Sequence, residues 1–193
     1  MKKIIIGALL GCSLLSTQVF AESKNVYIGL DVTKSSNEFS TDKGGYSGSV
    51  TKDSDSSAFK LKVGRLLEDN WRAQVYYLQE TYDDAMFDST NESLSEVGFD
   101  VIKEYELSDV LFPFAQVGIG YGWMDIDGYS SSSINEVNGK FGVGLIFKVA
   151  PAFEIITGAD AQYKKWSDRE IGSATIKTTE SSTKFYIGAN YHF

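Results

Sequence analysis

The feature that most constrains this chain is a two-residue alternation of apolar and polar or small side chains, which recurs from about residue 25 onward. In the segment 137–149, for example, Phe141, Val143, Leu145 and Phe147 occupy one parity, and Gly or Lys residues stand between them. Because successive side chains of a β-strand point to opposite faces, this period predicts strands whose two faces meet different surroundings. No segment beyond residue 25 has a helical period, so the sequence predicts an all-β fold.

Strands are expected in eight segments, which are 25–34, 57–67, 71–82, 94–107, 114–124, 137–149, 153–165 and 183–193. Each is long enough for a tilted membrane strand of about 9 to 11 residues. The connections alternate between short turns and longer segments rich in Ser, Asp, Gly and Thr, which is typical of bacterial barrels with periplasmic turns and extracellular loops. The prolines, Pro113 and Pro151, are both expected in short connections, since a proline cannot donate to a strand ladder. An even number of strands then places both termini in the periplasm.

Residues 1–21 have the pattern of a secretory signal peptide. Lys2 and Lys3 precede a short apolar run over 4–15, and the run ends shortly before Ala21, after which we expect cleavage. The barrel domain would then span 22–193. Two alternatives stay open: a buried N-terminal helix, and lipidation at Cys12, because residues 9–12 weakly resemble the lipobox of bacterial lipoproteins.

Composition excludes several function classes. The formal net charge is −8, which disfavours a nucleic-acid partner because phosphate binding requires a basic face. The only cysteine, Cys12, lies in the expected signal peptide, so the mature chain has no thiol chemistry. The only histidine is His192, which is expected to face the lumen at the periplasmic rim, so a Ser-His-acid triad on the outer side cannot form. We therefore predict no enzymatic activity, no cofactor and no metal site; the acidic pair around Asp125 lacks the glutamate of a calcium loop.

Alternation alone also fits a water-soluble barrel with its apolar face inward. Aromatic residues near the strand ends favour the membrane, because such residues form girdles at the two bilayer interfaces. The predicted girdle consists of Trp71, Tyr105, Tyr121, Trp123, Phe141, Phe147, Phe153 and Tyr163. The opposite face carries charges that can pair inside a narrow eight-stranded barrel. This predicted polar network of the lumen consists of Lys60, Lys62, Arg72, Glu80, Asp100, Glu104, Lys140, Lys148, Glu154, Asp160, Lys164 and Lys184.

The last strand carries a family resemblance. The alternating residues Phe185, Ile187, Ala189, Tyr191 and Phe193 resemble the C-terminal signature of outer-membrane barrels, which the barrel-assembly machinery reads. Residues 22–193 as a whole resemble the small eight-stranded transmembrane barrels of the OmpA, OmpX and opacity-protein type. The resemblance implies an antiparallel up-and-down barrel in the bacterial outer membrane, monomeric, in contact with outer-membrane lipid and lipopolysaccharide. It also implies a role in envelope integrity, surface interaction or adhesion.

Other functions remain open at this point. A narrow porin-like channel, a soluble periplasmic ligand-binding barrel and a lipid-modifying enzyme are the alternatives. The four longer connections contain more acidic than basic residues, so they could share divalent cations with lipopolysaccharide phosphates. Trp166, Tyr129 and Tyr46 are candidates for exposed contact residues in these connections.

Overall fold

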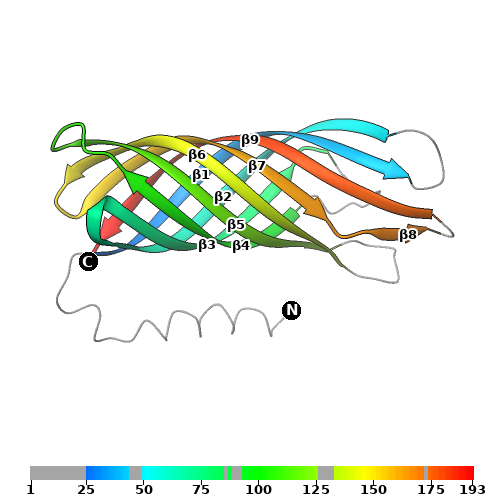
Figure 1. Cartoon of the computed structure of the whole chain (residues 1–193), viewed down its shortest axis with the longest axis horizontal. Helices are drawn as coiled ribbons and strands as arrows, with labels where there is room; N and C mark the ends of the chain where they lie inside the picture. Colours follow the sequence, from blue (N-terminus) through cyan, green and yellow to red (C-terminus); the bar gives the residue numbers. More distant parts are fainter. Residues whose placement is uncertain (1–24, 44–48, 85–86, 88–92, 126–132, 172–173) are drawn as a thin grey trace.

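The described part of the chain is one antiparallel β-sheet that closes into a barrel (Figure 1). The computed structural model describes residues 25–43, 49–84, 87, 93–125, 133–171 and 174–193. Closure comes from pairing of the first strand, β1 (Val26–Lys43), with the last, β9 (Ala174–His192), in a register that joins Tyr27 to His192. The predicted signal peptide and Tyr46 and Tyr129 lie outside the described residues.

Eight strands form the wall of the barrel, and each pairs with its neighbour along the chain. The others in the wall are β2 (Ser49–Leu66), β3 (Trp71–Tyr82), β4 (Ser93–Glu104), β5 (Leu111–Asp125), β6 (Ser133–Ala150) and β7 (Phe153–Trp166). The short β8 (Arg169–Ile171) pairs only with β9, and a 3-10 turn, η1 (Glu68–Asn70), joins β2 to β3. We call the end that holds η1 and His192 the turn end, and the opposite end, near β8, the loop end.

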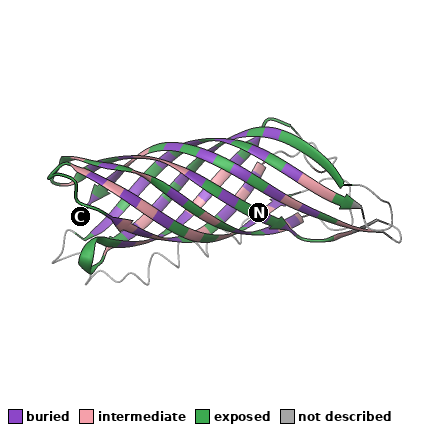
Figure 2. Ribbon diagram, turned by 45° about the horizontal axis from the view of Figure 1, so that its top comes forward, coloured by how far each residue is buried: buried purple, intermediate pink, exposed green. Residues whose placement is uncertain are grey.

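Side-chain burial follows the predicted alternation strand by strand (Figure 2). On β3, Trp71 and Val75 are exposed, whereas Arg72 and Gln74 are buried inside the barrel. Large apolar residues cover the outside, among them Ile119 with 68% of its surface exposed. A barrel that is polar inside and apolar outside is the inverse of a water-soluble one.

Several strands extend further toward the loop end than the sequence pattern predicts. Segments 35–43, 49–56, 133–136 and 174–182, which were expected to be loops, are parts of β1, β2, β6 and β9. Their outward residues, such as Ser36 and Glu38, are polar, so the hydrophobic alternation that identifies a strand is absent there. The ladder itself needs only backbone partners, which β1 finds in both β2 and β9 over its whole length.

The prediction that Pro113 lies in a connection is wrong, because Pro113 is in β5 and pairs with Leu145 of β6. Its carbonyl accepts a hydrogen bond from the Tyr105 amide, one residue beyond the end of β4. The amide and carbonyl of one residue in an antiparallel strand point to the same neighbour. The position where Pro113 lacks an N–H therefore faces β4 beyond Glu104, where the pairing of β4 with β5 has already ended. Pro151 lies between β6 and β7, as predicted.

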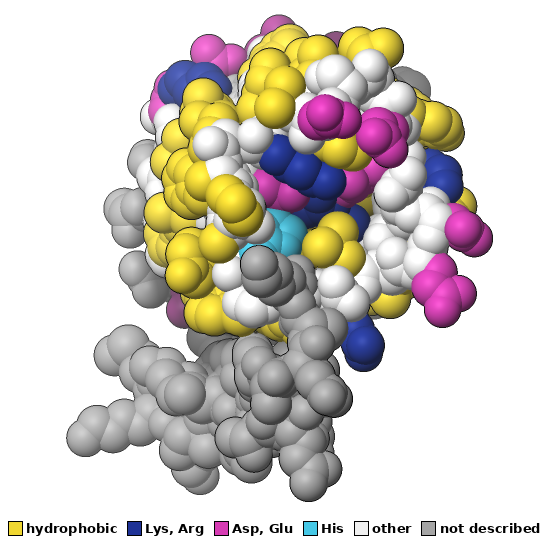
Figure 3. Space-filling model, turned by 90° about the vertical axis from the view of Figure 1, so that its left-hand side faces the viewer, with side chains coloured by type: hydrophobic (Ala, Val, Ile, Leu, Met, Phe, Trp, Pro, Cys, Tyr) yellow, Lys and Arg dark blue, Asp and Glu magenta, His cyan; other side chains and the backbone are white. Residues whose placement is uncertain are grey.

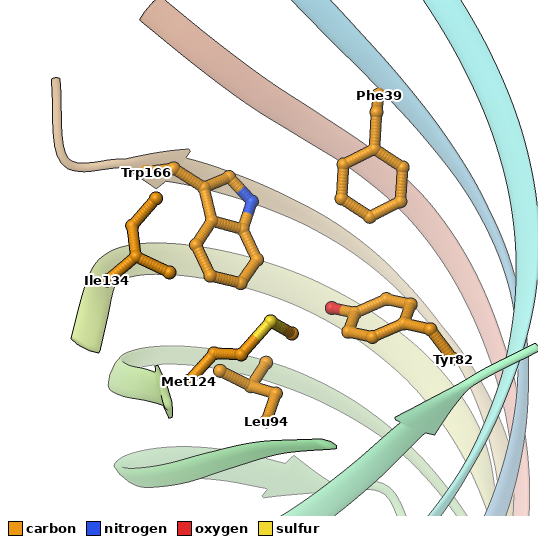
Figure 4. Packing of buried hydrophobic residues seen from close by; sticks show 6 residues of the cluster. All are labelled: Phe39, Tyr82, Leu94, Met124, Ile134 and Trp166. Carbon is orange, nitrogen blue, oxygen red and sulfur yellow. The ribbon is translucent and has the colours of Figure 1, made fainter. Parts of the chain in front are cut away.

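Apolar side chains fill the interior near both ends. Figure 4 shows the cluster at the loop end, whose members point into the barrel from different strands: Phe39, Tyr82, Leu94, Met124, Ile134 and Trp166. A second cluster lies toward the turn end and consists of Ile102, Phe112, Phe114, Ile146, Ile156 and Tyr186. The interpretation of Trp166 as an exposed contact residue is wrong. Only 1% of its surface is exposed, because its parity on β7 directs it inward.

Within the described ranges, no helix has both the length and the apolar character needed to cross a membrane.

Candidate functional site

The interior of the barrel gathers the residues expected to form a polar network. Ten of these residues are at most 4% exposed: Lys60, Lys62, Arg72, Glu80, Asp100, Glu104, Glu154, Asp160, Lys164 and Lys184. The Lys140 side chain is 5% exposed. Lys148 differs, since it is only partly buried and its ammonium lies 3.6 Å from the centre of the Phe112 ring at the turn end. Eight strands enclose a space just wide enough to be filled by such side chains.

Arg72 is the centre of the network at the turn end. Its guanidinium donates two hydrogen bonds to Glu154, at 2.7 and 3.0 Å, and its Nε contacts Glu104. Glu154 also contacts Nε2 of His192 at 2.9 Å, and Asn190 donates to the same carboxylate. Seen from the turn end, basic and acidic groups and the single histidine lie inside a rim of apolar side chains (Figure 3). The two parallel hydrogen bonds between Arg72 and Glu154 fix the orientation of both side chains and neutralise their charges.

The middle of the lumen contains two further carboxylate groups that pair with lysines. Asp31 of β1 pairs with two lysines of the adjacent strand β2, with Lys62 at 2.5 Å and with Lys60 at 3.2 Å. Asp100 receives Lys140 at 2.8 Å, and the Lys140 ammonium also lies 3.8 Å from the centre of the Tyr76 ring. Mixed pairing of this kind offsets part of the cost of burying these charges.

Toward the loop end, Glu80 bridges two lysines on the opposite wall. Lys164 lies 2.8 Å and Lys184 2.9 Å from its carboxylate, and Lys164 also pairs with Glu180 at 2.9 Å. Trp166 donates its indole N–H to Glu180 at 3.1 Å, which connects the ionic network to the apolar cluster at the loop end. Ion pairs therefore occur at the turn end, in the middle and toward the loop end of the lumen, and apolar side chains pack beside them toward both ends.

Several lumen residues were not among the predicted site residues. These are Asp31, Gln74, Tyr76, Glu96, Gln116, Glu136, Asn138, Gln162, Glu180 and Tyr186, all of which are buried. For most of them the signal was present in the sequence: Glu96, for instance, has the opposite parity to the outward Val97. Glu136 and Glu180 were assigned to acidic loops, but both lie in strands and point into the barrel.

Glycines make room for the charged heads. A Cβ placed on Gly188 would overlap the Asp31 carboxylate and the backbone carbonyl of Leu30, whereas a Cβ on the outward Gly139 would meet nothing within 4 Å. We expect Gly188→Ala to lower the free energy of unfolding by about 1–3 kcal/mol, through overpacking, and Gly139→Ala to change it little. Urea titration of the folded band on gels would measure both. Equal effects of the two substitutions would contradict the close packing of this lumen.

The predicted girdle residues lie on the outside of the barrel. Trp71, Tyr105, Tyr121, Phe141, Phe147, Phe153 and Tyr163 are exposed by 37–57%, and Trp123 is intermediate. Tyr105 follows the last residue of β4 rather than lying within the strand. In the C-terminal signature, Phe185, Ile187, Tyr191 and Phe193 are likewise exposed, and Ala189 is intermediate. These side chains supply the apolar outer surface that a bilayer requires.

The single histidine of the sequence, His192, lies at the turn end of the barrel. His192 is held between Glu154 and the Tyr27 ring, whose centre lies 5.3 Å from that of the imidazole. Among the residues that the structure describes, no group of three or more His, Cys, Asp or Glu side chains is placed to hold a metal ion. The ion pairs of the lumen fix the positions of its charged side chains.

Comparison with known proteins agrees with this architecture. A family model described as the outer membrane protein beta-barrel domain matches residues 7–193. The chain therefore belongs to the outer membrane β-barrel family, and it is an eight-stranded transmembrane barrel of the outer membrane. None of the curated proteins compared with this sequence matches it.

Solved structures with the same fold are small outer membrane barrels. AlkL, solved in lipid bilayers, aligns with a TM-score of 0.57 at 14% identity, over 90% of this chain and 94% of AlkL. OprG from Pseudomonas aeruginosa aligns with a TM-score of 0.55 at 11% identity, over 88% of this chain and 96% of OprG. Neisserial surface protein A aligns with a TM-score of 0.52 at 18% identity, over 85% and 97%. At these identities the likeness concerns the fold alone.

Proposed function

We propose that this chain is a closed, non-enzymatic barrel that anchors surface loops in the outer membrane. The observation that carries the proposal is the filled lumen. Ion pairs centred on Arg72 and Lys164 connect opposite walls, and apolar clusters pack the interior toward either end. A narrow barrel packed in this way serves as an anchor, and the parts that vary without cost to it are the loops.

The proposed orientation places the turn end in the periplasm and the loop end outside the cell. Short connections such as η1 and the turn at Pro151 lie at the turn end, which matches the asymmetry of bacterial barrels. The extensions of β1, β2 and β9 raise polar outward faces at the loop end, as a segment standing above the bilayer requires. Outer-membrane lipid and lipopolysaccharide would contact the apolar belt below them. A protease that cleaves the loops of intact cells supports this orientation, and cleavage restricted to permeabilised cells would contradict it.

A conductance measurement separates this function from a narrow porin-like channel. In planar bilayers the reconstituted wild-type protein is expected to give no steady open current, because charged and apolar side chains occupy the lumen. A porin reconstituted in the same bilayers is the positive control. A steady wild-type current that changes on Lys60→Ala or Glu104→Ala would contradict the proposal, because both side chains lie in the lumen.

The C-terminal strand is proposed to be the signal for the barrel-assembly machinery. Deletion of Phe193, whose side chain is 48% exposed and leaves the lumen untouched, is expected to reduce the folded protein in outer membranes several-fold. Refolding of the same variant from urea into detergent should be nearly unchanged. A deletion that leaves the amount in cells unaltered, or that impairs refolding in detergent equally, would contradict a role as a recognition signal.

A further inference from the structure

The buried charges of the lumen do not balance. The cations in ion pairs within the barrel are Lys60, Lys62, Arg72, Lys140, Lys164 and Lys184. The buried carboxylates are Asp31, Glu80, Glu96, Asp100, Glu104, Glu136, Glu154, Asp160 and Glu180. Among the described residues, no lysine, arginine or histidine lies within ion-pair distance of Glu96, Glu136 or Asp160. A buried carboxylate without a counter-charge is costly, so these groups need a partner of another kind.

Two of these carboxylates, Glu96 and Glu136, approach each other across a single strand. Both are 1% exposed, and both have Gly122 of β5 as their Cα partner, one from β4 and the other from β6. The positions that Cβ atoms would take on Gly120 and Gly122 are occupied by these carboxylates and by the amide of Asn138. The glycines of β5 thus give space to acidic groups that repel each other.

The side chains around the two carboxylates present unused oxygens. Asn138 donates to Glu136 at 3.0 Å, and Gln162 donates to Glu96 at 3.4 Å. The carbonyl oxygens of these two amides, Oδ1 of Asn138 and Oε1 of Gln162, are buried without a hydrogen-bond partner. The Asn138 oxygen and Oε1 of Glu96 both lie within 3 Å of the point where a Cβ on Gly120 would stand. A half-turn of either amide exchanges its donor for its acceptor.

We propose that Glu96, Glu136, Asn138 and Gln162 form a binding site for one hard divalent cation, with calcium as its best-fitting occupant, inside the barrel. Two carboxylates and two carboxamide oxygens are an all-oxygen set, and calcium accepts six to eight such ligands in flexible geometry. One divalent ion neutralises both carboxylates at once and uses the oxygens that otherwise have no partner. A single shared proton would neutralise only one carboxylate. The site is enclosed by the wall, so the ion enters while the barrel folds.

Terbium, which replaces calcium and emits when a nearby aromatic ring is excited, reports on this site directly. The Tyr76 hydroxyl donates to Glu96 at 2.6 Å, and Trp166 is the cross-strand neighbour of Glu136. The full mature chain should be refolded from urea into detergent free of lipopolysaccharide, with chelator, with calcium or with terbium. We expect sensitised emission that saturates near one ion per chain, competition by calcium, and an unfolding midpoint several degrees higher in calcium than in chelator.

Glu136→Gln is the decisive variant, and Glu38→Gln, which changes an exposed outward carboxylate on β1, is its matched control. Glu136→Gln is expected to weaken binding at least tenfold and to abolish the calcium-dependent rise of the midpoint. In chelator it should be at least as stable as wild type, because it removes an uncompensated charge; this separates loss of binding from failure to fold. Absence of one-to-one binding by wild type, or equal binding by Glu136→Gln, would overturn the proposal.

Discussion

Arg72→Met is expected to lower the free energy of unfolding by about 3–5 kcal/mol, because it leaves buried carboxylates without their counter-charge. Arg72 is 1% exposed and is the shared partner of Glu104 and Glu154. Methionine is unbranched, flexible and uncharged with a similar volume, so lost packing contributes only the smaller part of the effect. The acidic pair would remain near each other, with only His192 and Asn190 beside Glu154.

Urea unfolding of the refolded protein, followed by the mobility of the unheated band on gels, measures this effect. Arg65→Met is the matched control, since Arg65 on β2 is exposed on the outside of the barrel. We expect the control to change stability by less than about 1 kcal/mol, as is usual for surface charges. A small effect of Arg72→Met would mean that the ion pairs at the turn end do not contribute to stability.

Val143→Arg should cost about 2–4 kcal/mol, the range for a basic residue at the middle of the lipid-facing surface of a barrel. Val143 is 50% exposed and is the central residue of the outward series on β6 that runs from Val137 to Val149. Ser181→Arg is the control, because Ser181 is exposed on the polar extension of β9 toward the loop end. Refolding into lipid vesicles measures both variants. Equal stability of the two would mean that Val143 does not face hydrocarbon.

The architecture could be predicted because the lipid-facing residues of each strand are apolar, whereas the alternate residues that face the lumen are polar or small. The alternation from Trp71 to Tyr82 predicts the exact bounds of β3, since turn residues flank both ends of the strand. The expected barrel closes in the structure through the pairing of β1 with β9. Which charged residues face inward was fixed by parity alone, and eleven of the twelve predicted lumen residues are enclosed in the structure.

The extent of the strands could not be predicted in the same way. Beyond the membrane both faces of a strand meet polar surroundings, so residues such as Ser36 and Asn37 show no alternation although they lie deep inside β1. For the same lack of alternation, Glu136, Trp166 and Glu180 were assigned to loops, whereas in the structure their side chains are buried inside the barrel. The ion-pair partners within the lumen could not be predicted either, because residues such as Arg72 and Glu154 are 82 positions apart in the sequence and meet across the interior.

The central physical claim is that, on each strand, residues of one parity face hydrocarbon and residues of the other parity face a packed polar interior. A spin label at Val143 tests it most directly, with a label at Ser181 as the water-exposed reference. Gly144 cannot carry the inward label, because even a Cβ there would overlap the Phe114 ring and the Thr157 carbonyl. In native membranes the Val143 label should be relaxed by dissolved oxygen and shielded from a water-soluble nickel chelate, the reverse of Ser181. Access of the chelate to Val143 equal to that at Ser181 would contradict the account.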